Sequence, residues 1–198
     1  MNAAEIIVEE YFRYVRGIFT RTSIRGIGQA ELDIVGVDPS KSPPTFFHIE
    51  SSVSISSVYS RITDKPFTPS EARQRQKMAG QRRTAEFFIA KKFFSDEVLT
   101  TLKQVGCKTK DLKRVLVSWE FDNEARRVLE GKGIECLTMK KIFQELADYL
   151  AEVTCNIDSE IIRTLQLFVR SQPTMPKIFS VQTIRKRKKR NDLERGRK

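Results

Sequence analysis

Two segments of alternating polar and apolar residues, joined by a short proline-containing loop, constrain the fold of this chain most strongly. Residues 31–38 (ELDIVGVD) and 45–56 (TFFHIESSVSIS) follow the two-residue period of a half-buried β-strand. The loop PSKSPP between them has the prolines and serines of a hairpin connection. Asp33 falls on the face opposite Leu32 and Ile34, and Glu50 falls on the polar face of the second segment. We therefore expect two neighbouring strands that each carry an acidic side chain.

Helix and strand patterns surround this hairpin. We predict a helix over residues 3–16, a β-prone stretch over 17–24, and a helix of roughly 20 residues that starts with a capping box at Thr68–Glu71. The rest of the chain predicts strands within 112–121 and at 134–138, helices over 122–133 and after Thr138, and a final amphipathic helix over 158–171. The fold class is therefore α/β, with a mixed central sheet flanked by helices.

The composition fits one domain with an appendage, because 198 residues with 13 Phe, 4 Tyr and 1 Trp provide the bulk for a core. We expect an α/β domain over residues 1–155, a C-terminal helix and extension over 156–184 that packs on the domain or on a partner, and a disordered basic tail over 185–198. No segment approaches the roughly 18 to 20 apolar residues of a membrane span. The acidic N-terminus also differs from a secretory signal. We expect an intracellular, cytoplasmic protein that does not bind membranes.

The cysteines and the single histidine argue against a disulfide framework or a zinc site. Cys107, Cys136 and Cys155 are odd in number and far apart, and His48 is the only histidine. We expect each cysteine to be a small core residue. His48 shares a strand face with Glu50 and is expected to be solvated or hydrogen-bonded. Gly26 and Gly28 are expected to form a tight turn, with close approach to phosphate as the alternative.

Positive charge is concentrated at the C-terminus. Residues 185–198 hold nine Lys or Arg and two acids, which accounts for +7 of the formal net charge of +11. Such a block suits contact with a polyanion, although a solubilising or localising role is equally open. A second basic cluster lies on the helix predicted after residue 68, where a solvated helix face is the alternative. The candidate nucleic-acid-binding residues are Arg73, Lys77, Arg82, Arg83, Arg185, Lys186, Arg187, Lys188, Lys189 and Arg190.

Asp33 and Glu50 are the candidate metal ligands. On neighbouring strands of a hairpin they can reach one cation, and hard cations such as Mg²⁺ bind through one or two carboxylates, water and phosphate oxygens. A metal held in this way activates water and neutralises charge on a phosphodiester. The alternative is that both acids are merely solvated on exposed strands.

The order of elements resembles the PD-(D/E)XK, or restriction-endonuclease-like, superfamily over roughly residues 3–150. The segments that carry the resemblance are GIFTRTSIRGIGQAELDIVGVD, FFHIESS and LKRVLVSWEF, with the helices between them. Archaeal Holliday-junction resolvases and Mrr-type endonucleases are the most similar branches. The resemblance implies a restriction-endonuclease-like sheet and a Mg²⁺- or Mn²⁺-dependent endonuclease that binds metal through Asp33 and Glu50. It also implies that an acid of the first helix joins the metal site, either Glu5 or Glu9, and we expect Glu9. If the resolvase branch applies, the resemblance implies a homodimer.

The chain departs from the family at the expected lysine. The E-x-K motif reads Glu50-Ser51-Ser52, and a serine hydroxyl is uncharged at pH 7. Either Lys77 or Lys65 replaces that lysine, with Gln76 as a polar neighbour, or the site is weakened or inactive. The candidate catalytic residues are Asp33, Glu50, Ser52 and Lys77.

Three functions remain open from the sequence. The first is a metal-dependent endonuclease that hydrolyses phosphodiesters, with DNA as the expected substrate. The second is a nuclease-like fold without catalysis that binds DNA or RNA or forms part of a complex. The third is a protein-interaction module in which the 158–171 helix docks a partner.

Overall fold

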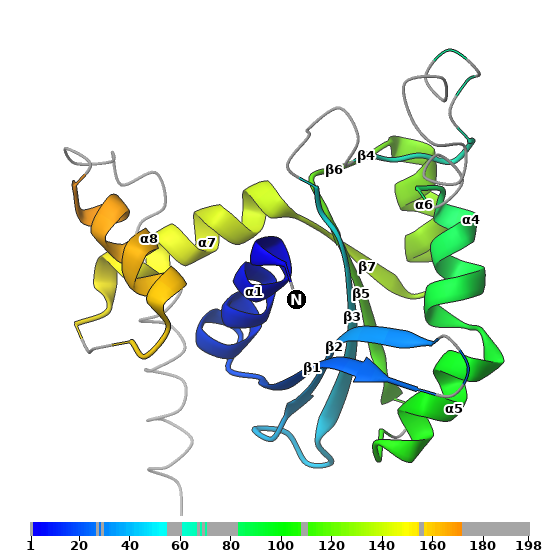
Figure 1. The fold of residues 1–198 in the computed structure, drawn as a ribbon, viewed down its shortest axis with the longest axis horizontal. Coiled ribbons are helices and arrows are strands. Elements are labelled where there is room, and N and C mark those ends of the chain that lie inside the picture. Colours follow the sequence, from blue (N-terminus) through cyan, green and yellow to red (C-terminus); the bar gives the residue numbers. More distant parts are fainter. Residues whose placement is uncertain are drawn as a thin grey trace, which may run out of the picture.

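A computed structural model describes residues 2–26, 28, 30–54, 61–66, 68, 70, 83–107, 111–154 and 157–171. A five-stranded sheet with the order β1-β2-β3-β5-β7 forms its centre (Figure 1). The strands are β1 (Phe19–Arg25), β2 (Glu31–Asp38), β3 (Thr45–Ser52), β5 (Lys113–Ser118) and β7 (Ile134–Thr138). The first three strands pair antiparallel, and β3, β5 and β7 pair parallel. The predicted mixed sheet in an α/β fold is therefore confirmed.

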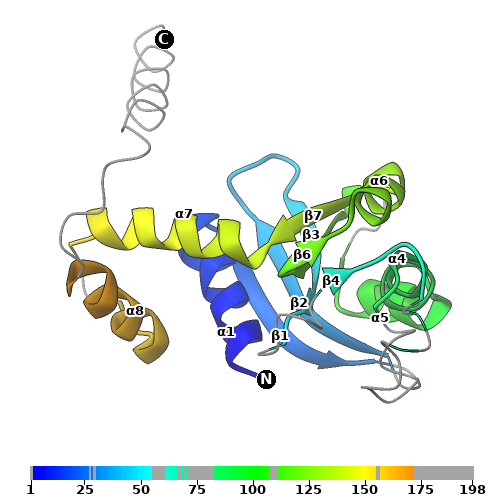
Figure 2. The same cartoon turned by 90° about the horizontal axis from the view of Figure 1, so that it is seen from above.

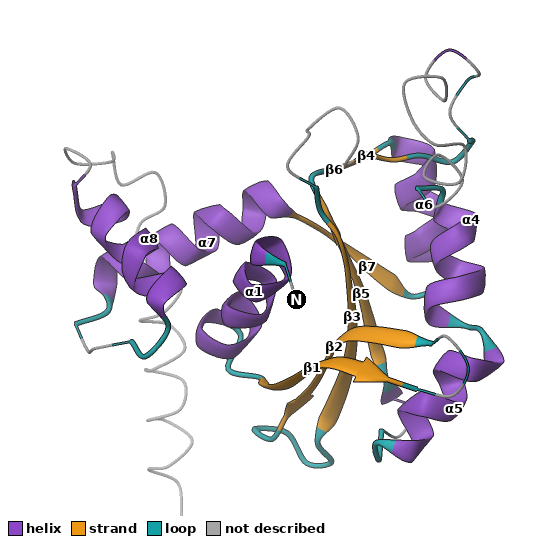
Figure 3. Cartoon of the chain, viewed as in Figure 1, coloured by secondary structure: helices purple, strands orange, loops and turns teal. Residues whose placement is uncertain are grey.

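Helices cover both faces of this sheet (Figure 3). On one face lie α1 (Ala3–Glu10), its continuation η1 (Tyr11–Val15) and α7 (Met139–Glu152). On the other face lie α4 (Ala85–Phe87), η3 (Phe88–Phe93), α5 (Asp96–Gln104) and α6 (Asn123–Gly131). Alternate residues of the central strands supply the two cores, so that Val115 and Val117 face α7 while Leu116 faces α4 and α6.

Local capping explains where the helices begin. Asn2 accepts from the Glu5 N–H, and the Glu5 side chain reaches back to the Asn2 N–H, which completes a capping box for α1. The predicted cap at Thr138 is confirmed, since its hydroxyl accepts from Lys141 N–H at 3.3 Å. Asp122 caps α6 in the same way.

The prediction of one helix of roughly 20 residues after Thr68 is wrong at its C-terminal part. Thr84 is extended, with φ −84° and ψ 149°, and it pairs with Thr63 in an isolated bridge. Its hydroxyl then caps a new helix by accepting from Phe87 N–H. Of the predicted helix start, Thr68 and Ser70 are described, and residues 71–82 lie outside the described part of the chain.

One helix and one small two-stranded sheet were missed by the sequence interpretation. The stretch 96–104, to which the sequence interpretation assigned no element, forms α5, capped by Ser95. Two short strands, β4 (Arg61–Ile62) and β6 (Glu120–Phe121), also pair in a separate parallel sheet.

The C-terminal helix α8 (Glu160–Ser171) packs on the domain. Ile162 is fully buried and belongs to the same core as α7, with Leu165 partly buried beside it. Leu167 and Phe168 stay exposed, at 72% and 60%. Residues 172–198, including the predicted basic tail, lie outside the described part of the chain. Among the helices that the structure describes, none has both the length and the apolar character needed to cross a membrane.

Candidate functional site: two carboxylates and a lysine

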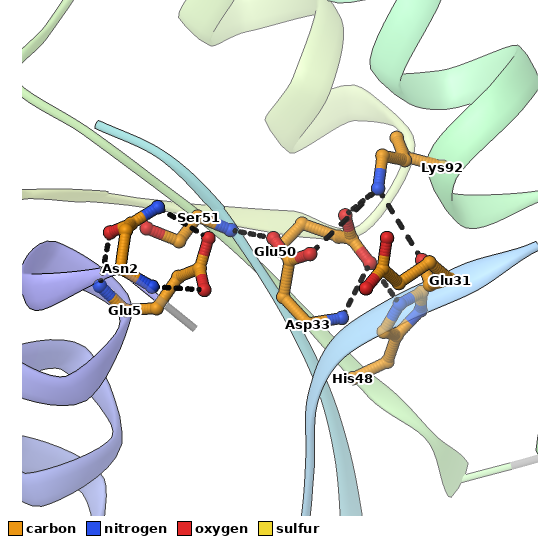
Figure 4. A network of polar contacts seen from close by, with 8 residues as sticks. All are labelled: Asn2, Glu5, Glu31, Asp33, His48, Glu50, Ser51 and Lys92. Carbon is orange, nitrogen blue, oxygen red and sulfur yellow. Dashed lines mark hydrogen bonds and ion pairs between the residues drawn. The ribbon is translucent and has the colours of Figure 1, made fainter. Parts of the chain in front are cut away.

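Asp33 and Glu50 meet where β2 and β3 stop pairing as regular strands. The antiparallel pairing ends at Ile34 opposite Ile49. Beyond this pair, the side chains of Asp33 and Glu50 accept hydrogen bonds from backbone N–H groups of the opposite strand. Ser51 N–H donates to Asp33 Oδ2 at 2.8 Å, and Asp33 N–H points to Glu50 Oε1 at 3.4 Å. The structure thus brings the two predicted acids together, with each carboxylate binding a backbone N–H of the opposite strand (Figure 4).

The pairing of β2 with β1 is also interrupted at Asp33. Thr22 lies opposite Ile34 and Ile24 lies opposite Leu32, but Ser23 and Asp33 between them are not paired in the register. Ser23 has a φ of 49°, in the left-handed region that a residue with a side chain rarely adopts. This break in the strand pair lets the Asp33 N–H turn toward Glu50, and such local strain is common beside functional groups.

Glu50 is buried, so the alternative of two solvated acids is wrong for this residue. Its side chain is 1% exposed, because β3 is a central strand with helices on both faces. His48 Nε2 lies 2.9 Å from Glu50 Oε1, and the His48 ring is fully buried against Phe93 at a centroid distance of 5.1 Å. Of the two expectations for His48, the hydrogen-bonded one is confirmed. Its contact holds the Glu50 carboxylate in one orientation.

Lys92 supplies a positive charge that the sequence interpretation did not find. Its Nζ lies 2.7 Å from Glu50 Oε2 and 3.9 Å from Asp33 Oδ1, and it donates to the Glu31 carbonyl at 3.4 Å. The lysine comes from η3, on the helical layer that covers this face of the sheet. One sequence signal was available: Lys92 lies four residues after the buried Phe88 and therefore on the inward side of that helix.

Of the two lysines proposed from the sequence, only Lys65 is described, and it forms no ion pair with either carboxylate in the described part of the chain. Lys65 is exposed, and its backbone carbonyl accepts a hydrogen bond from the Thr63 hydroxyl at 2.7 Å. Lys77 and Gln76 lie outside the described residues. Ser52 is half-buried, and its carbonyl accepts from the Ser118 hydroxyl at 3.2 Å.

Burial and nearby charges shift the pKa values of the two carboxylates in opposite directions. Burial, followed by the negative charge of Glu50, raises the pKa of Asp33 to about 7, against the opposing effects of Lys92 and the Ser51 N–H. Burial also acts to raise the pKa of Glu50, but the hydrogen bond and charge of His48 together with Lys92 outweigh it and hold this pKa below its ordinary value. Burial acts to lower the pKa of Lys92, and the charges of Glu50 and Asp33 overcome that effect and raise it.

Of the two acids on the first helix, the structure brings Glu5 toward the site. Its negative charge contributes to the raised pKa of Asp33, and Figure 4 shows it beside Ser51. Glu9, the residue chosen from the sequence, instead accepts from the Thr20 hydroxyl of β1 at 2.9 Å. One helical turn separates the two acids, and the Asn2 N–H donates to the Glu5 carboxylate at 3.0 Å, which orients that side chain at the start of α1.

The donor set fits a hard divalent cation. Asp33 and Glu50 offer carboxylate oxygens, and the repulsion between them, which adds to burial in raising the pKa of Asp33, would be relieved by a cation. Within the described residues, no group of three or more His, Cys, Asp or Glu side chains is arranged to hold a metal. Two carboxylates are compatible with Mg²⁺, since this ion keeps several water ligands.

The predicted nucleic-acid contacts are largely outside the described residues. This applies to Arg73, Lys77 and Arg82 and to the tail residues 185–190. Arg83 is described and half-buried, and its carbonyl accepts from Thr63 N–H at 3.2 Å. Gly28 has a φ of +69°, which agrees with the predicted turn, whereas Gly26 is needed because a Cβ there would lie 1.9 Å from Thr101 Oγ1.

Comparison with known proteins identified no relative. No protein-family model matches the sequence, and no curated protein matches it. No solved structure matches the fold.

Proposed function

We propose that this chain is a metal-dependent nuclease of the PD-(D/E)XK type, with Asp33, Glu50 and Lys92 as its active-site residues. The contact that carries the proposal is the 2.7 Å ion pair between Lys92 Nζ and Glu50 Oε2, next to Asp33. It joins two carboxylates from neighbouring strands with a lysine, which are the chemical groups of the family motif. The lysine comes from a helix because the motif position itself carries Ser52.

Each residue has a distinct role in this proposal. Asp33 and Glu50 would hold Mg²⁺ or Mn²⁺, which when bound supplies an activated water and neutralises charge on the phosphodiester. Lys92 contributes the positive charge that the hydroxyl of Ser52 lacks at neutral pH. His48 positions Glu50 through the 2.9 Å contact with Oε1. Asp33 must lose its proton to bind a cation, so the affinity for metal should increase with pH.

The order of elements supports a restriction-endonuclease-like fold within this proposal. An N-terminal helix, a three-stranded antiparallel meander and two parallel strands joined through helices follow one another along the chain. The substrate would be nucleic acid, with DNA as the first candidate, because the C-terminal 14 residues hold nine basic side chains that suit a phosphate backbone. Phosphate contacts position a protein without selecting a base sequence.

A second candidate function is a nucleic-acid-binding subunit of the same fold that has lost catalysis. The observation that favours it is the burial of Glu50, whose two oxygens already contact His48 and Lys92. A cation would have to share Oε2 with Lys92 or displace it. Asp33 is more accessible, with a side chain that is 17% exposed.

Cleavage assays on single-stranded, duplex and branched DNA and on RNA test the two functions. Each substrate is incubated with Mg²⁺ or Mn²⁺ and, in parallel, with EDTA. We expect metal-dependent cleavage that is lost in Asp33→Ala and Glu50→Ala and falls about 100-fold or more in Lys92→Gln. Lys91→Gln is the matched control, because Lys91 is the exposed neighbour on the same helix. Binding of the panel without cleavage, equally by wild type and both acid variants, would identify the inactive subunit.

A further inference from the structure

A cavity of ≈ 980 Å³ lies beyond the carboxyl ends of β5 and β7, among β6, α6, α7 and α8. Trp119 directly follows the last residue of β5, and Thr138 is the last residue of β7. Figure 2 shows β6 and the start of α7 at this end of the sheet. Ligands of open α/β sheets bind beyond the carboxyl ends of the parallel strands. The lining residues differ from Asp33, Glu50 and Lys92, so this is a separate site.

Aromatic rings form the apolar part of the cavity. Trp119 and Phe143 stack with centroids 6.2 Å apart and an interplanar angle of 26°, and both line the space. The indole N–H of Trp119 donates to the Ser54 carbonyl at 2.7 Å, which fixes the ring. Phe168 of α8 also lines the cavity although its side chain is 60% exposed. A planar ligand can therefore stack on rings that are already held in place.

Positive charge surrounds these rings. Arg61, Arg126 and Lys140 line the cavity together with one acid, Glu120. The guanidinium of Arg126 lies 5.3 Å from the centroid of the Phe121 ring. Arg61 and Lys140 are exposed. The combination selects a ligand that is both aromatic and anionic, because an apolar peptide side chain would gain nothing from the cations.

We propose that this cavity receives an unpaired base of a single-stranded nucleic acid, with the flanking phosphates at Arg61 and Lys140. Base stacking on aromatic side chains next to a basic surface is a sequence-tolerant way to bind single strands. The proposal deepens the proposed nuclease function and rests on it for the path of the strand. Ser54, which holds Trp119, is four residues beyond Glu50, at most about 14 Å along the chain. A bound strand can thus span both sites within a few nucleotides.

Trp119 makes the cavity directly observable, since it is the only tryptophan in the chain. Its fluorescence is titrated with unlabelled oligothymidylate of about ten nucleotides, within the site size of known single-strand binders. EDTA is present to prevent cleavage. An oligouridylate of the same length distinguishes DNA from RNA, and the oligothymidylate annealed to its complement tests the need for unpaired bases. We expect quenching by the single strands and much weaker quenching by the duplex.

Two neighbouring residues of α8 provide a matched pair of variants. Phe168→Ala removes an exposed lining ring, and Leu167→Ala removes an exposed side chain that does not line the cavity. Neither residue is buried, so both variants should fold. We expect Phe168→Ala to weaken binding about fivefold or more and Leu167→Ala to leave it unchanged. Arg61→Gln should weaken binding and lower its salt dependence.

The proposal is overturned if single strands leave Trp119 fluorescence unchanged, if duplex quenches it as strongly, or if both α8 variants weaken binding equally. Quenching by an apolar peptide but not by oligonucleotides would also overturn it and identify a protein-docking groove. These outcomes are separable from the nuclease proposal. If cleavage depends on metal and on Asp33 but single strands leave the Trp119 fluorescence unchanged, only the base site is rejected. Specific quenching without any cleavage rejects only the catalytic function.

Discussion

Lys92 Nζ lies 2.7 Å from Glu50 Oε2, although the two residues come from a helix and from the central strand of the sheet beneath it. The carboxylate is almost fully buried, whereas the lysine keeps 29% of its side chain exposed. A buried carboxylate needs a charged or hydrogen-bonding partner, and Glu50 has both Lys92 and His48. The same contact that stabilises the fold therefore provides the positive charge of the candidate active site.

Removing Lys92 should destabilise the protein through the charge left on Glu50. We expect Lys92→Met to lower the free energy of unfolding by about 1–3 kcal/mol at pH 7, since His48 still contacts the carboxylate and solvent reaches the lysine. The double variant Lys92→Met with Glu50→Gln should recover much of this loss, because no unpaired charge remains. Urea unfolding of the wild type, both single variants and the double variant gives the coupling energy. Additive losses would contradict the ion pair.

The raised pKa of Asp33 predicts a stability that falls with pH. The folded state keeps this proton up to a pH of about 7, whereas the unfolded chain loses it near its ordinary value of 3.8. The contribution is therefore fully present below about pH 4 and is lost as the pH rises through about 7. Asp33→Asn should match the wild type near pH 4 and exceed it by about 1–3 kcal/mol at pH 8. Urea unfolding at both values tests this, and a difference that does not depend on pH would reject it.

Metal binding should be measurable without any substrate. We expect Mn²⁺ at about 100 times its dissociation constant to raise the stability of the wild type by about 2.7 kcal/mol, seen as a higher Tm. Asp33→Asn should abolish the shift. Glu5→Gln should reduce it more than Glu9→Gln, because Glu5 acts on Asp33 while Glu9 binds Thr20. Equal shifts in wild type and Asp33→Asn would place the metal elsewhere.

Gly26 should not tolerate a side chain. A Cβ at this position would lie 1.9 Å from Thr101 Oγ1 and 2.7 Å from Thr101 Cβ, so α5 would have to move away from the turn. We expect Gly26→Ala to lower the free energy of unfolding by about 1–3 kcal/mol. Gly131→Ala is the control, because a Cβ there meets open space among the described residues. That variant should be neutral or slightly stabilising.

The basic residues 185–190 should control the salt dependence of nucleic-acid binding. Each phosphate contact contributes about −0.9 to the slope of log K against log salt on duplex DNA. Replacing Arg185, Lys186, Arg187, Lys188, Lys189 and Arg190 by glutamine should reduce the magnitude of the slope by about 2 or more. Fluorescence anisotropy with labelled duplex at several salt concentrations measures this. An unchanged slope would assign the segment to solubility or localisation.

Much of the fold could be predicted from local patterns. The segment 31–38 forms β2 with the predicted bounds, and the caps at Asp122 and Thr138 start the predicted helices. Alternation identified Asp33 and Glu50 on neighbouring strands. These features are encoded within a few residues, so they are visible without knowing what packs against them. The prediction that Leu32 and Ile34 share one face is wrong, because the strand pairing is interrupted at Asp33 and the two residues pack in different cores.

The tertiary structure decided which groups share the site. Glu50 and His48 are buried because β3 is a central strand of the sheet. The alternating pattern of the β3 sequence does not show that position. The interruption at Thr84 depends on its pairing with Thr63, and the choice of Lys92 depends on how η3 lies against β2 and β3. Alternation and capping are local and determine where elements form and which way their side chains point. The partner of a buried charge depends on packing between segments that are distant in the sequence. For the pairing of Lys92 with Glu50, the only indication in the sequence is that Lys92 lies four residues after Phe88.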